Sequence, residues 1–263
     1  MTKKILTIMA MTIMAVACTQ KADEPLQYGE LSVALSGEPT IEVVSKAPQT
    51  LEQTAEEASA YVVRIFDSSD DSMKYEKTYD AFETQRLPLG TYYVTAENCT
   101  EAQAEEGNGK MRLYGCSEEV TIAPETLTPT AIVNCVVTNA KVSVQFDESV
   151  AGRFSGLQVT LAGGTTPDRS LTIAQTEAGV ITETWFNPSS LTYTISGTFT
   201  GSGMNKPVEI VKTITLEAKN NIKLLVRVNL ENGQLSPSIK VDTDIDNLQE
   251  TTEEFNPYMS TNK

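Results

Sequence analysis

Apolar and polar side chains alternate with a period of two residues along most of the chain. Two sets of apolar residues show this most clearly: Leu31, Val33 and Leu35, and then Val142, Val144 and Phe146. Similar runs span residues 61–67, 91–97, 111–115, 130–137, 156–162, 191–200 and 222–230, and another begins at Ile210. Successive side chains of a strand point to opposite faces of its sheet, so the pattern predicts half-buried strands and a chain that is nearly all β.

A strong hairpin signal lies near the end of the chain. Asn232 and Gly233 separate residues 226–230 from residues 234–241. An Asn-Gly pair favours the two-residue turns of β-hairpins because both residues tolerate positive φ. We therefore predict that the final domain ends in a hairpin at this pair.

An internal repeat indicates two domains. Val120-Thr121-Ile122, followed by residues 131–137, is echoed by Ile214-Thr215-Leu216, followed by residues 222–228. The offset is 215 − 121 = 94 residues, which matches one sandwich of about 100 residues. We predict an all-β fold of two tandem Ig-like antiparallel β-sandwiches with a stiff junction near Asn139. The predicted parts are domain 1 at residues 29–138, domain 2 at residues 139–243 and an acidic C-terminal tail at residues 244–263.

The N-terminus has the parts of a bacterial lipoprotein signal. Two lysines precede an uncharged run, residues 5–16, and small residues lead up to Cys18. The run is shorter than the roughly 20 residues of a permanent membrane span but suits a secretory signal. A small residue before a cysteine at this position resembles the lipobox, in which the thiol is acylated with chains such as palmitate. We predict a signal peptide at residues 1–17, a lipid anchor on Cys18 and a tether at residues 18–28; the alternative is an ordinary signal with a free thiol.

The tether also bears on location. Its acidic pair, Asp23 and Glu24, resembles the surface-export signal of Bacteroidales lipoproteins. We therefore expect the protein on the outer membrane, exposed at the cell surface. The alternative is a flexible tether that leaves the protein facing the periplasm.

Charge and composition exclude several classes of function. The chain has 20 basic and 35 acidic residues and no histidine, for a net charge of −15. Such a chain cannot neutralise a phosphate backbone, which excludes nucleic acid as a partner. Without histidine there is no Ser-His-Asp or Cys-His pair and no zinc site that needs imidazole. We nominate no catalytic residue and expect no enzyme activity; the alternative is a glycoside hydrolase built on paired carboxylates, although no pair stands out.

One acidic segment matches part of a calcium-binding pattern. Asp242, Asp244, Asp246 and Glu253 have the spacing of positions 1, 3, 5 and 12 of an EF-hand loop. Asn247 stands where the sharp turn requires glycine, and amphipathic helices are missing on both sides. We expect a solvated acidic tail and no cofactor, with calcium as the alternative.

Three cysteines remain after Cys18 is assigned to lipid. Because their number is odd, at most one intramolecular disulfide can form among Cys99, Cys116 and Cys135. The pair Cys99 and Cys116, the pair Cys116 and Cys135, and three buried free thiols are the three alternatives. With no histidine nearby, none resembles a catalytic nucleophile.

Two further residues have a candidate role in glycan chemistry. Asp71-Ser72-Met73 fits the Asp-Ser/Thr-apolar acceptor pattern of Bacteroidales O-glycosylation, which marks Ser72. Trp185 is the single tryptophan. A lone tryptophan can act as a platform on which a sugar stacks, but we expect it to be partly buried in the core of a sandwich.

Several segments together resemble a known family. They are the lipobox, the strand at residues 31–36, Ser45-Lys46-Ala47, the strand at residues 61–67 and the turn Leu87-Pro88-Leu89-Gly90-Thr91-Tyr92. This arrangement resembles an uncharacterised Bacteroidales lipoprotein family, a domain of unknown function that is similar to the fimbrillins. The resemblance covers most of the chain. It implies two transthyretin-like β-sandwiches and a role in adhesion or surface assembly.

Fimbrillin assembly implies a proteolytic cut after Lys46 and a groove that a strand of the next subunit fills. The candidate donor, residues 242–263, has few alternating apolar side chains and is therefore a poor donor strand. We predict a lipid-anchored surface binding or adhesion protein whose partners are the membrane, through its anchor, and a surface glycan or protein. The alternative is a fimbrillin-like pilus subunit or tip adhesin that adds to itself by strand exchange.

Overall fold

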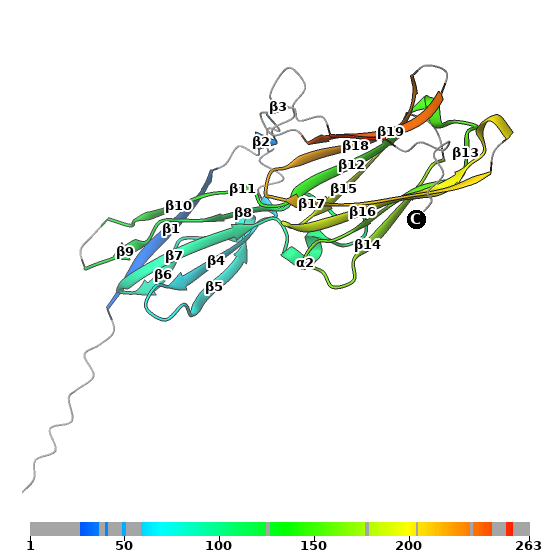
Figure 1. The fold of residues 1–263 in the computed structure, drawn as a ribbon. Coiled ribbons are helices and arrows are strands. Elements are labelled where there is room, and N and C mark those ends of the chain that lie inside the picture. Colours follow the sequence, from blue (N-terminus) through cyan, green and yellow to red (C-terminus); the bar gives the residue numbers. More distant parts are fainter. Residues whose placement is uncertain are drawn as a thin grey trace, which may run out of the picture.

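The computed structural model describes residues 27–36, 40–41, 49–50, 59–124, 127–176, 179–203, 205–231, 234–243 and 251–254. Nearly all the regular structure in these ranges is β, and it forms two bodies that follow each other along the chain (Figure 1). Both are β-sandwiches, as predicted. Within the described ranges, no helix has the length and apolar character needed to cross a membrane.

The first sandwich packs two sheets together. The smaller sheet has the order β10-β1-β6, with β1 at Tyr28–Ser36, β6 at Gln85–Pro88 and β10 at Thr130–Asn134. The larger has the order β11-β8-β7-β4-β5, and β9 also pairs with β7. Its strands are β4 (Val62–Asp67), β5 (Met73–Thr78), β7 (Gly90–Glu97), β8 (Leu113–Cys116), β9 (Val120–Ile122) and β11 (Val136–Val137). The short strands β2 (Thr40–Ile41) and β3 (Gln49–Thr50) pair with each other.

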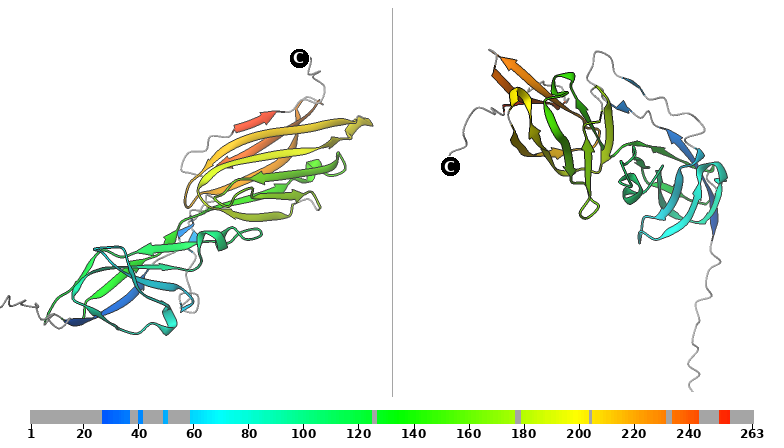
Figure 2. Two further views of the ribbon diagram at one scale, coloured as in Figure 1. Left: turned by 90° about the horizontal axis from the view of Figure 1, so that it is seen from below. Right: turned by 90° about the vertical axis from the view of Figure 1, so that its right-hand side faces the viewer.

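The second sandwich is also built from two sheets. One has the order β15-β12-β18-β19-β20 and consists of β12 (Ala140–Phe146), β15 (Ile181–Phe186), β18 (Asn221–Glu231), β19 (Gln234–Thr243) and β20 (Thr251–Glu254). The other has the order β14-β13-β16-β17 and consists of β13 (Phe154–Ala162), β14 (Ser170–Ala174), β16 (Ser189–Phe199) and β17 (Lys206–Leu216). Figure 2 shows the two sandwiches from two further directions.

The two sandwiches share one topology. In one sheet of each sandwich, the first strand is central: β1 lies between β6 and β10, and β12 lies between β15 and β18. In the other sheet, β7 lies between β4 and β9, and β16 lies between β13 and β17. In each sandwich one pair is parallel, β1 with β10 and β12 with β18, and the other described pairs are antiparallel. The sequence repeat is therefore a repeat of structure. Alternation of side chains does not distinguish parallel from antiparallel neighbours, so the sequence did not reveal the parallel pairs.

Each sandwich has its own apolar core. Val63 of β4 and Val94 of β7 are fully buried in the first core, and Val144 of β12 and Val159 of β13 are fully buried in the second. Their neighbours along each strand point outward, which is the alternation seen in the sequence. The limits of the two domains given from the sequence stay a prediction.

The structure confirms the hairpin, since Glu231 of β18 pairs with Gln234 of β19. It divides the predicted run at residues 130–137, because β10 and β11 belong to different sheets of the first sandwich. The chain crosses between them at Cys135, which is buried. A continuous apolar run does not show such a crossing.

Irregular turns complete the fold. The described residues include the short α-helix α2 (Glu101–Ala104) and the 3-10 turns η1 (Tyr79–Ala81), η2 (Glu148–Val150) and η3 (Gly201–Gly203). The predicted acidic tail also contains β20, which pairs with β19 of the same chain.

Tyr92 closes the corner between the two sheets of the first sandwich. Pro88 ends β6 and Gly90 begins β7. The Tyr92 hydroxyl donates a hydrogen bond of 2.8 Å to the Pro88 carbonyl, and the side chain is buried. The turn at residues 87–92 therefore folds over its own tyrosine.

We expect Tyr92→Phe to lower the free energy of unfolding by about 1–2 kcal/mol, because the partly buried Pro88 carbonyl loses its partner. Urea unfolding followed by tryptophan fluorescence measures this. The matched control is Tyr93→Phe, whose hydroxyl bonds to Asp71 at 3.2 Å on the exposed surface. It should change the free energy by less than about 0.5 kcal/mol. Equal losses in the two variants would contradict the role of Tyr92.

Candidate functional site

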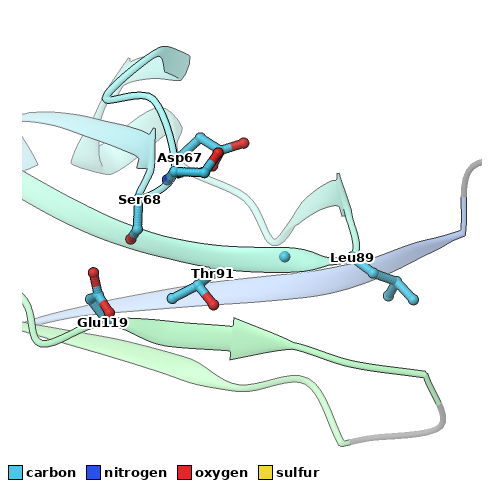
Figure 3. Close-up of a pocket in the computed structure, with 7 residues that line it drawn as sticks. Asp67, Ser68, Leu89, Thr91 and Glu119 are labelled. Carbon is cyan, nitrogen blue, oxygen red and sulfur yellow. Dashed lines mark hydrogen bonds between the residues drawn. The ribbon is translucent and has the colours of Figure 1, made fainter.

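A polar pocket lies at one end of the first sandwich, where the β4–β5 turn meets the corner between β6 and β7 (Figure 3). Its volume is about 380 Å³, and it is lined by Asp67, Ser68, Ser69, Leu89, Gly90, Thr91 and Glu119. Apart from Leu89 and Gly90, every lining residue carries a hydroxyl or a carboxylate. The pocket therefore suits a small group that donates hydrogen bonds, such as a hydroxyl or an ammonium.

Asp67 is largely held by the turn itself. Its Oδ1 accepts hydrogen bonds from the hydroxyl and the amide of Ser69, at 2.6 and 3.0 Å, and its Oδ2 lies 3.3 Å from Lys74 Nζ. The Ser69 hydroxyl, the Ser69 amide and Lys74 hold the pKa of Asp67 below its usual value. Asp67 is thus an anionic acceptor at neutral pH and does not suit the role of general acid.

Ser68 contributes a buried hydroxyl to the same pocket. Its oxygen has no hydrogen-bond partner among the described residues, while its amide donates to the Thr91 carbonyl at 2.9 Å. In Figure 3 the hydroxyl points toward the side of the pocket where Thr91 and Glu119 lie. A buried polar group without a partner is unusual in a folded protein.

The remaining acids of the β4–β5 turn shape the hairpin. Asp70 Oδ1 accepts from the hydroxyl of Ser72 at 2.5 Å and from its amide at 2.9 Å. Asp71 has a φ of 55°, which Asp tolerates better than most residues. Turn chemistry thus accounts for this acidic cluster. Glycosylation of Ser72 stays a prediction, and it would replace the hydroxyl hydrogen that now bonds to Asp70.

The calcium pattern in the tail is described only in part. Asp242 lies at the end of β19 and Glu253 in β20, while Asp244 and Asp246 lie outside the described residues. In the part of the chain that the structure describes, no group of three or more metal-ligating side chains is close enough to hold an ion. The calcium alternative therefore stays an untested prediction.

A buried carboxylate, Glu105, joins the two sandwiches. It directly follows α2, which begins with a capping box: Thr100 Oγ1 accepts from the Gln103 amide at 3.2 Å, and Gln103 Oε1 accepts from the Thr100 amide at 3.1 Å. The Glu105 side chain is 0% exposed. The helix α2 lies where the two sandwiches meet (Figure 1), and the Glu105 side chain that follows it bonds to Thr166 and Asn187 of the second sandwich.

Backbone amides of the second sandwich enclose the Glu105 carboxylate. Oε2 accepts from the Thr166 amide at 2.7 Å and Oε1 from the Asn187 amide at 2.8 Å, while the Thr165 amide lies 3.1 Å from both oxygens. Burial alone would raise the pKa of Glu105, but the hydrogen bonds from Thr166, Asn187 and Thr165 outweigh it and lower that pKa. Glu105 is therefore a buried anion at neutral pH.

Arg169 supplies the opposite charge. Its Nη1 lies 3.7 Å from Glu105 Oε1 and donates to the Trp185 carbonyl at 2.7 Å, and its Nη2 donates to the Gly107 carbonyl at 3.2 Å. The guanidinium lies 4.1 Å from the centre of the Phe186 ring. Burial lowers the pKa of Arg169, but an arginine stays charged in proteins. Because it bonds to groups of both sandwiches, Arg169 reinforces the junction.

Two glycines are required at this junction. Gly164 has a φ of 92°, and a Cβ there would lie 2.2 Å from Glu105 Oε1. Gly109 has a φ of 79°, and a Cβ there would lie 2.5 Å from the Trp185 carbonyl oxygen. A side chain at Gly164 would displace the Glu105 carboxylate, and one at Gly109 would displace the backbone at Trp185 or Ala104.

Trp185 and Asn139 complete the contact. Trp185 lies on β15 of the second sandwich but packs against the core of the first, and its amide donates to the Asn108 carbonyl at 2.9 Å. Asn139 is fully buried; its Nδ2 donates to the Lys110 carbonyl at 2.7 Å, and its Oδ1 accepts from the Arg112 amide at 3.0 Å. Trp185 is thus partly buried, as expected, but between the sandwiches instead of within its own.

Sequence reasoning missed Glu105. One glutamate in a polar stretch carries no sign of its partners. Thr100 and Gln103 do form the S/T-x-x-E/Q pattern of a capping box, which predicts a helix start. That signal indicates α2, but it does not indicate what the helix carries.

The predicted modification sites fall into two groups. Cys18 and Lys46 lie outside the described residues. Cys99, Cys116 and Cys135 are free thiols in the structure, but the alternative of three buried thiols describes only two of them. Cys116 is exposed, whereas Cys99 and Cys135 are buried. Burial raises the pKa of Cys135 to about 11.

Comparison with known proteins gives one family match. The model of the family described as "Domain of unknown function (DUF4493)" matches residues 27–257. No curated protein matches the chain.

Several solved structures are similar to this one at low sequence identity. They include the fimbrial anchor protein Mfa2 from Porphyromonas gingivalis (12% identity, 82% of this chain and 98% of that chain, TM-score 0.42) and a fimbrial assembly protein from Parabacteroides distasonis (13%, 83% and 99%, TM-score 0.43). A candidate adhesin from Bacteroides ovatus (12%, 90% and 98%) has a TM-score of 0.47.

We expect Glu105→Gln to lower the free energy of unfolding by about 3–5 kcal/mol, because Arg169 is left as a buried charge without its partner. Urea unfolding measures the loss. The matched control is Glu101→Gln, which removes an exposed ion pair of 3.3 Å to Arg112 and should cost less than about 1 kcal/mol. A loss of the same size in both variants would show that the junction is not the cause.

The same contact predicts a pH dependence. The pKa of Glu105 in the folded protein lies below its usual value of 4.5. Its stabilising contribution is therefore fully present above that value and is lost as the pH falls through the folded pKa. The unfolding free energy of Glu105→Gln should fall less steeply over this acid range than that of the unmodified chain, and parallel curves would count against the assignment.

Thiol labelling provides a separate check on the cysteines. At pH 7, a maleimide should modify the exposed Cys116 within minutes and leave Cys99 and Cys135 unmodified, because both are buried and out of reach of the reagent. Mass spectrometry of peptides locates the label, and labelling in urea, where all three should react, is the control. A disulfide-linked peptide from the native protein would contradict the free-thiol arrangement.

Proposed function

The chain belongs to the family described as a domain of unknown function (DUF4493), and because that description assigns no activity, we propose a function from the molecule itself. In this proposal the protein is anchored by lipid at the outer-membrane surface and acts by binding or adhesion, not by catalysis. In this proposal the signal peptide at residues 1–17 is removed and acyl chains on Cys18 hold the protein to the membrane. The tether at residues 18–28 then leads directly into the first sandwich.

The junction around Glu105 is the observation that carries this proposal. The buried pair of Glu105 and Arg169, together with Trp185, fixes the second sandwich on the first. A protein that presents a contact surface at a distance from the membrane benefits from such a rigid body, because a partner then binds a surface of fixed geometry and less flexibility is lost on binding. The turns and loops at its ends supply contact surfaces.

The polar pocket of the first sandwich is the proposed contact point for one group of a partner. Asp67 and Glu119 bring two carboxylates to its lining, and Ser68 brings an unpaired hydroxyl. A hydroxyl or ammonium group of a surface glycan or protein would bind there. Asp67 does not suit the role of general acid in a glycoside hydrolase, because the turn holds its carboxylate in the anionic form.

A fimbrillin-like pilus subunit or tip adhesin is the second candidate, and one observation favours it. In the second sandwich β19 pairs with the outer edge of β18, whereas the equivalent edge of β10 has no partner among the described strands. An open edge of this kind is where a strand of another subunit can be added. In this candidate, cleavage after Lys46 precedes assembly.

The test combines surface proteolysis with mapping of the N-terminus. Intact cells are treated lightly with protease, and the protein from untreated cells is examined by mass spectrometry. We expect a protein that is cut on intact cells and whose N-terminus is an acylated Cys18. A control protein of the periplasm should survive the same treatment.

Two results would contradict the leading proposal. Resistance on intact cells, with cleavage only after the outer membrane is permeabilised, would mean a protein that faces the periplasm. An N-terminus at Ala47 in high-mass assemblies would favour the pilus subunit over the monomeric binding protein.

A further inference from the structure

Small hydroxyl side chains cover the outward face of the sheet β14-β13-β16-β17 in the second sandwich. Leu191, Tyr193 and Ile195 of β16 are buried in the core, so the residues between them point away from it. The strand registers extend this face over the neighbouring strands. Its residues, which we call the hydroxyl face, are Ser170, Thr172 and Ala174 on β14; Gln158, Thr160 and Ala162 on β13; Ser190, Thr192, Thr194, Ser196 and Thr198 on β16; and Pro207, Glu209, Val211, Thr213 and Thr215 on β17.

The residues of the hydroxyl face form rows that cross the strands. One row consists of Thr172, Thr160, Thr194 and Val211, and the next consists of Ser170, Ala162, Thr192 and Thr213. Neighbouring strands lie roughly 4.8 Å apart, and alternate residues along a strand lie roughly 6.7 Å apart. The hydroxyl and methyl groups therefore repeat at regular intervals in two directions.

Hydrogen bonds between strands hold several of these groups in place. The hydroxyl oxygens of Thr160 and Thr172 are 3.1 Å apart, and those of Thr192 and Thr213 are 3.0 Å apart. In a third pair, the side-chain amide of Gln158 donates to the Ser196 hydroxyl at 3.3 Å. Each hydroxyl has one donor and two acceptor sites, so a bonded pair keeps further sites for a ligand in a fixed position.

The fold itself does not require this composition. The equivalent sheet of the first sandwich carries the ion pairs of Arg64 with Glu76 and Glu97, and the stacked rings of Phe66 and Tyr93. The chain as a whole is 21% charged, yet Glu209 is the single charged residue of the hydroxyl face as defined above. Threonine favours strands, which explains the presence of threonine but not the near-absence of lysine, arginine and acids.

We propose that the hydroxyl face binds a neutral polysaccharide that lies flat across β13, β16 and β17. This inference rests on the proposed surface-binding function and names the class of its partner. A neutral polysaccharide presents hydroxyl groups that donate and accept hydrogen bonds, separated by C–H groups. The threonine side chain offers the same two features, a hydroxyl and a methyl.

Charge distinguishes this partner from other polymers. The net charge of −15 repels polyanions, and the hydroxyl face has no cation that would bind phosphate or sulfate groups. Because Val211 is its only large apolar residue, the face does not suit a lipid surface. A neutral glycan is not repelled by the acidic chain, and Glu209 is the single charged residue that it would meet on this face.

The experiment uses the purified full-length lipoprotein in detergent, run in native gels that contain a β-glucan, a mannan or dextran. We expect retardation in at least one of these gels. Thr160→Arg with Thr194→Arg places two bulky cations at the centre of the hydroxyl face and should weaken that binding at least tenfold. Thr194→Val keeps the shape but removes one hydroxyl, and should weaken it severalfold.

The matched control is Gln145→Arg, an outward substitution on β12 of the opposite sheet, which should bind like the unmodified protein. Thermal unfolding of each variant shows that it is folded. The proposal is overturned if no neutral polysaccharide retards the unmodified protein. It is overturned as well if the variant with Thr160→Arg and Thr194→Arg is retarded as strongly as the unmodified protein. A third result also overturns it: the unmodified protein is a dimer, the double variant is a monomer, and neither binds a polysaccharide, so that the hydroxyl face is an interface between two copies of the chain.

The adherence of intact cells separates failure of this inference from failure of the proposed function. If neutral polysaccharides do not bind but cells with the protein adhere to a surface and cells without it do not, the proposed function stands and this partner is wrong. If neutral polysaccharides do not bind and cells with and without the protein adhere equally, the polysaccharide partner and the proposed function are both wrong.

Discussion

Burial of the Glu105 carboxylate is the constraint on which the arrangement of the two sandwiches depends. A carboxylate that leaves water must regain its hydrogen bonds inside the protein. Glu105 regains them from backbone amides of two separate segments, at Thr166 and Asn187, and Arg169 balances its charge. Two bodies with separate cores are thereby held in one orientation, and Gly164 leaves the space that the carboxylate occupies.

The same topology serves two different surfaces. The inward positions of both sandwiches carry apolar residues because both must exclude water from a core. The outward positions are free of that requirement, and they have diverged. The first sandwich carries charged and aromatic groups such as Arg64 and Tyr93, whereas the second carries the neutral hydroxyl face. The chemistry that distinguishes the two repeats therefore lies outside the shared framework.

The candidate contact surfaces lie on the two sandwiches that Glu105 and Arg169 join. The pocket near Ser68 belongs to the first sandwich and the hydroxyl face to the second. The junction holds the first sandwich against the second. A partner that contacts both surfaces would therefore restrict less motion between the sandwiches than it would between two independent domains. The net charge of −15 disfavours a polyanionic partner.

The alternation of apolar residues determined the all-β class, because the period of a strand is a local property of the chain. The echo of residues 120–137 determined the repeat, and the pair Asn232 and Gly233 determined the hairpin in which Glu231 pairs with Gln234. The capping pattern of Thr100 and Gln103 was local as well and could have revealed α2. Only the tertiary structure decided that Glu105 meets Thr166, 61 residues away, that β1 and β10 run parallel, and that threonines of separate strands form one face. Those features depend on sheet order and register, which are set by packing of the whole chain and not by any single segment.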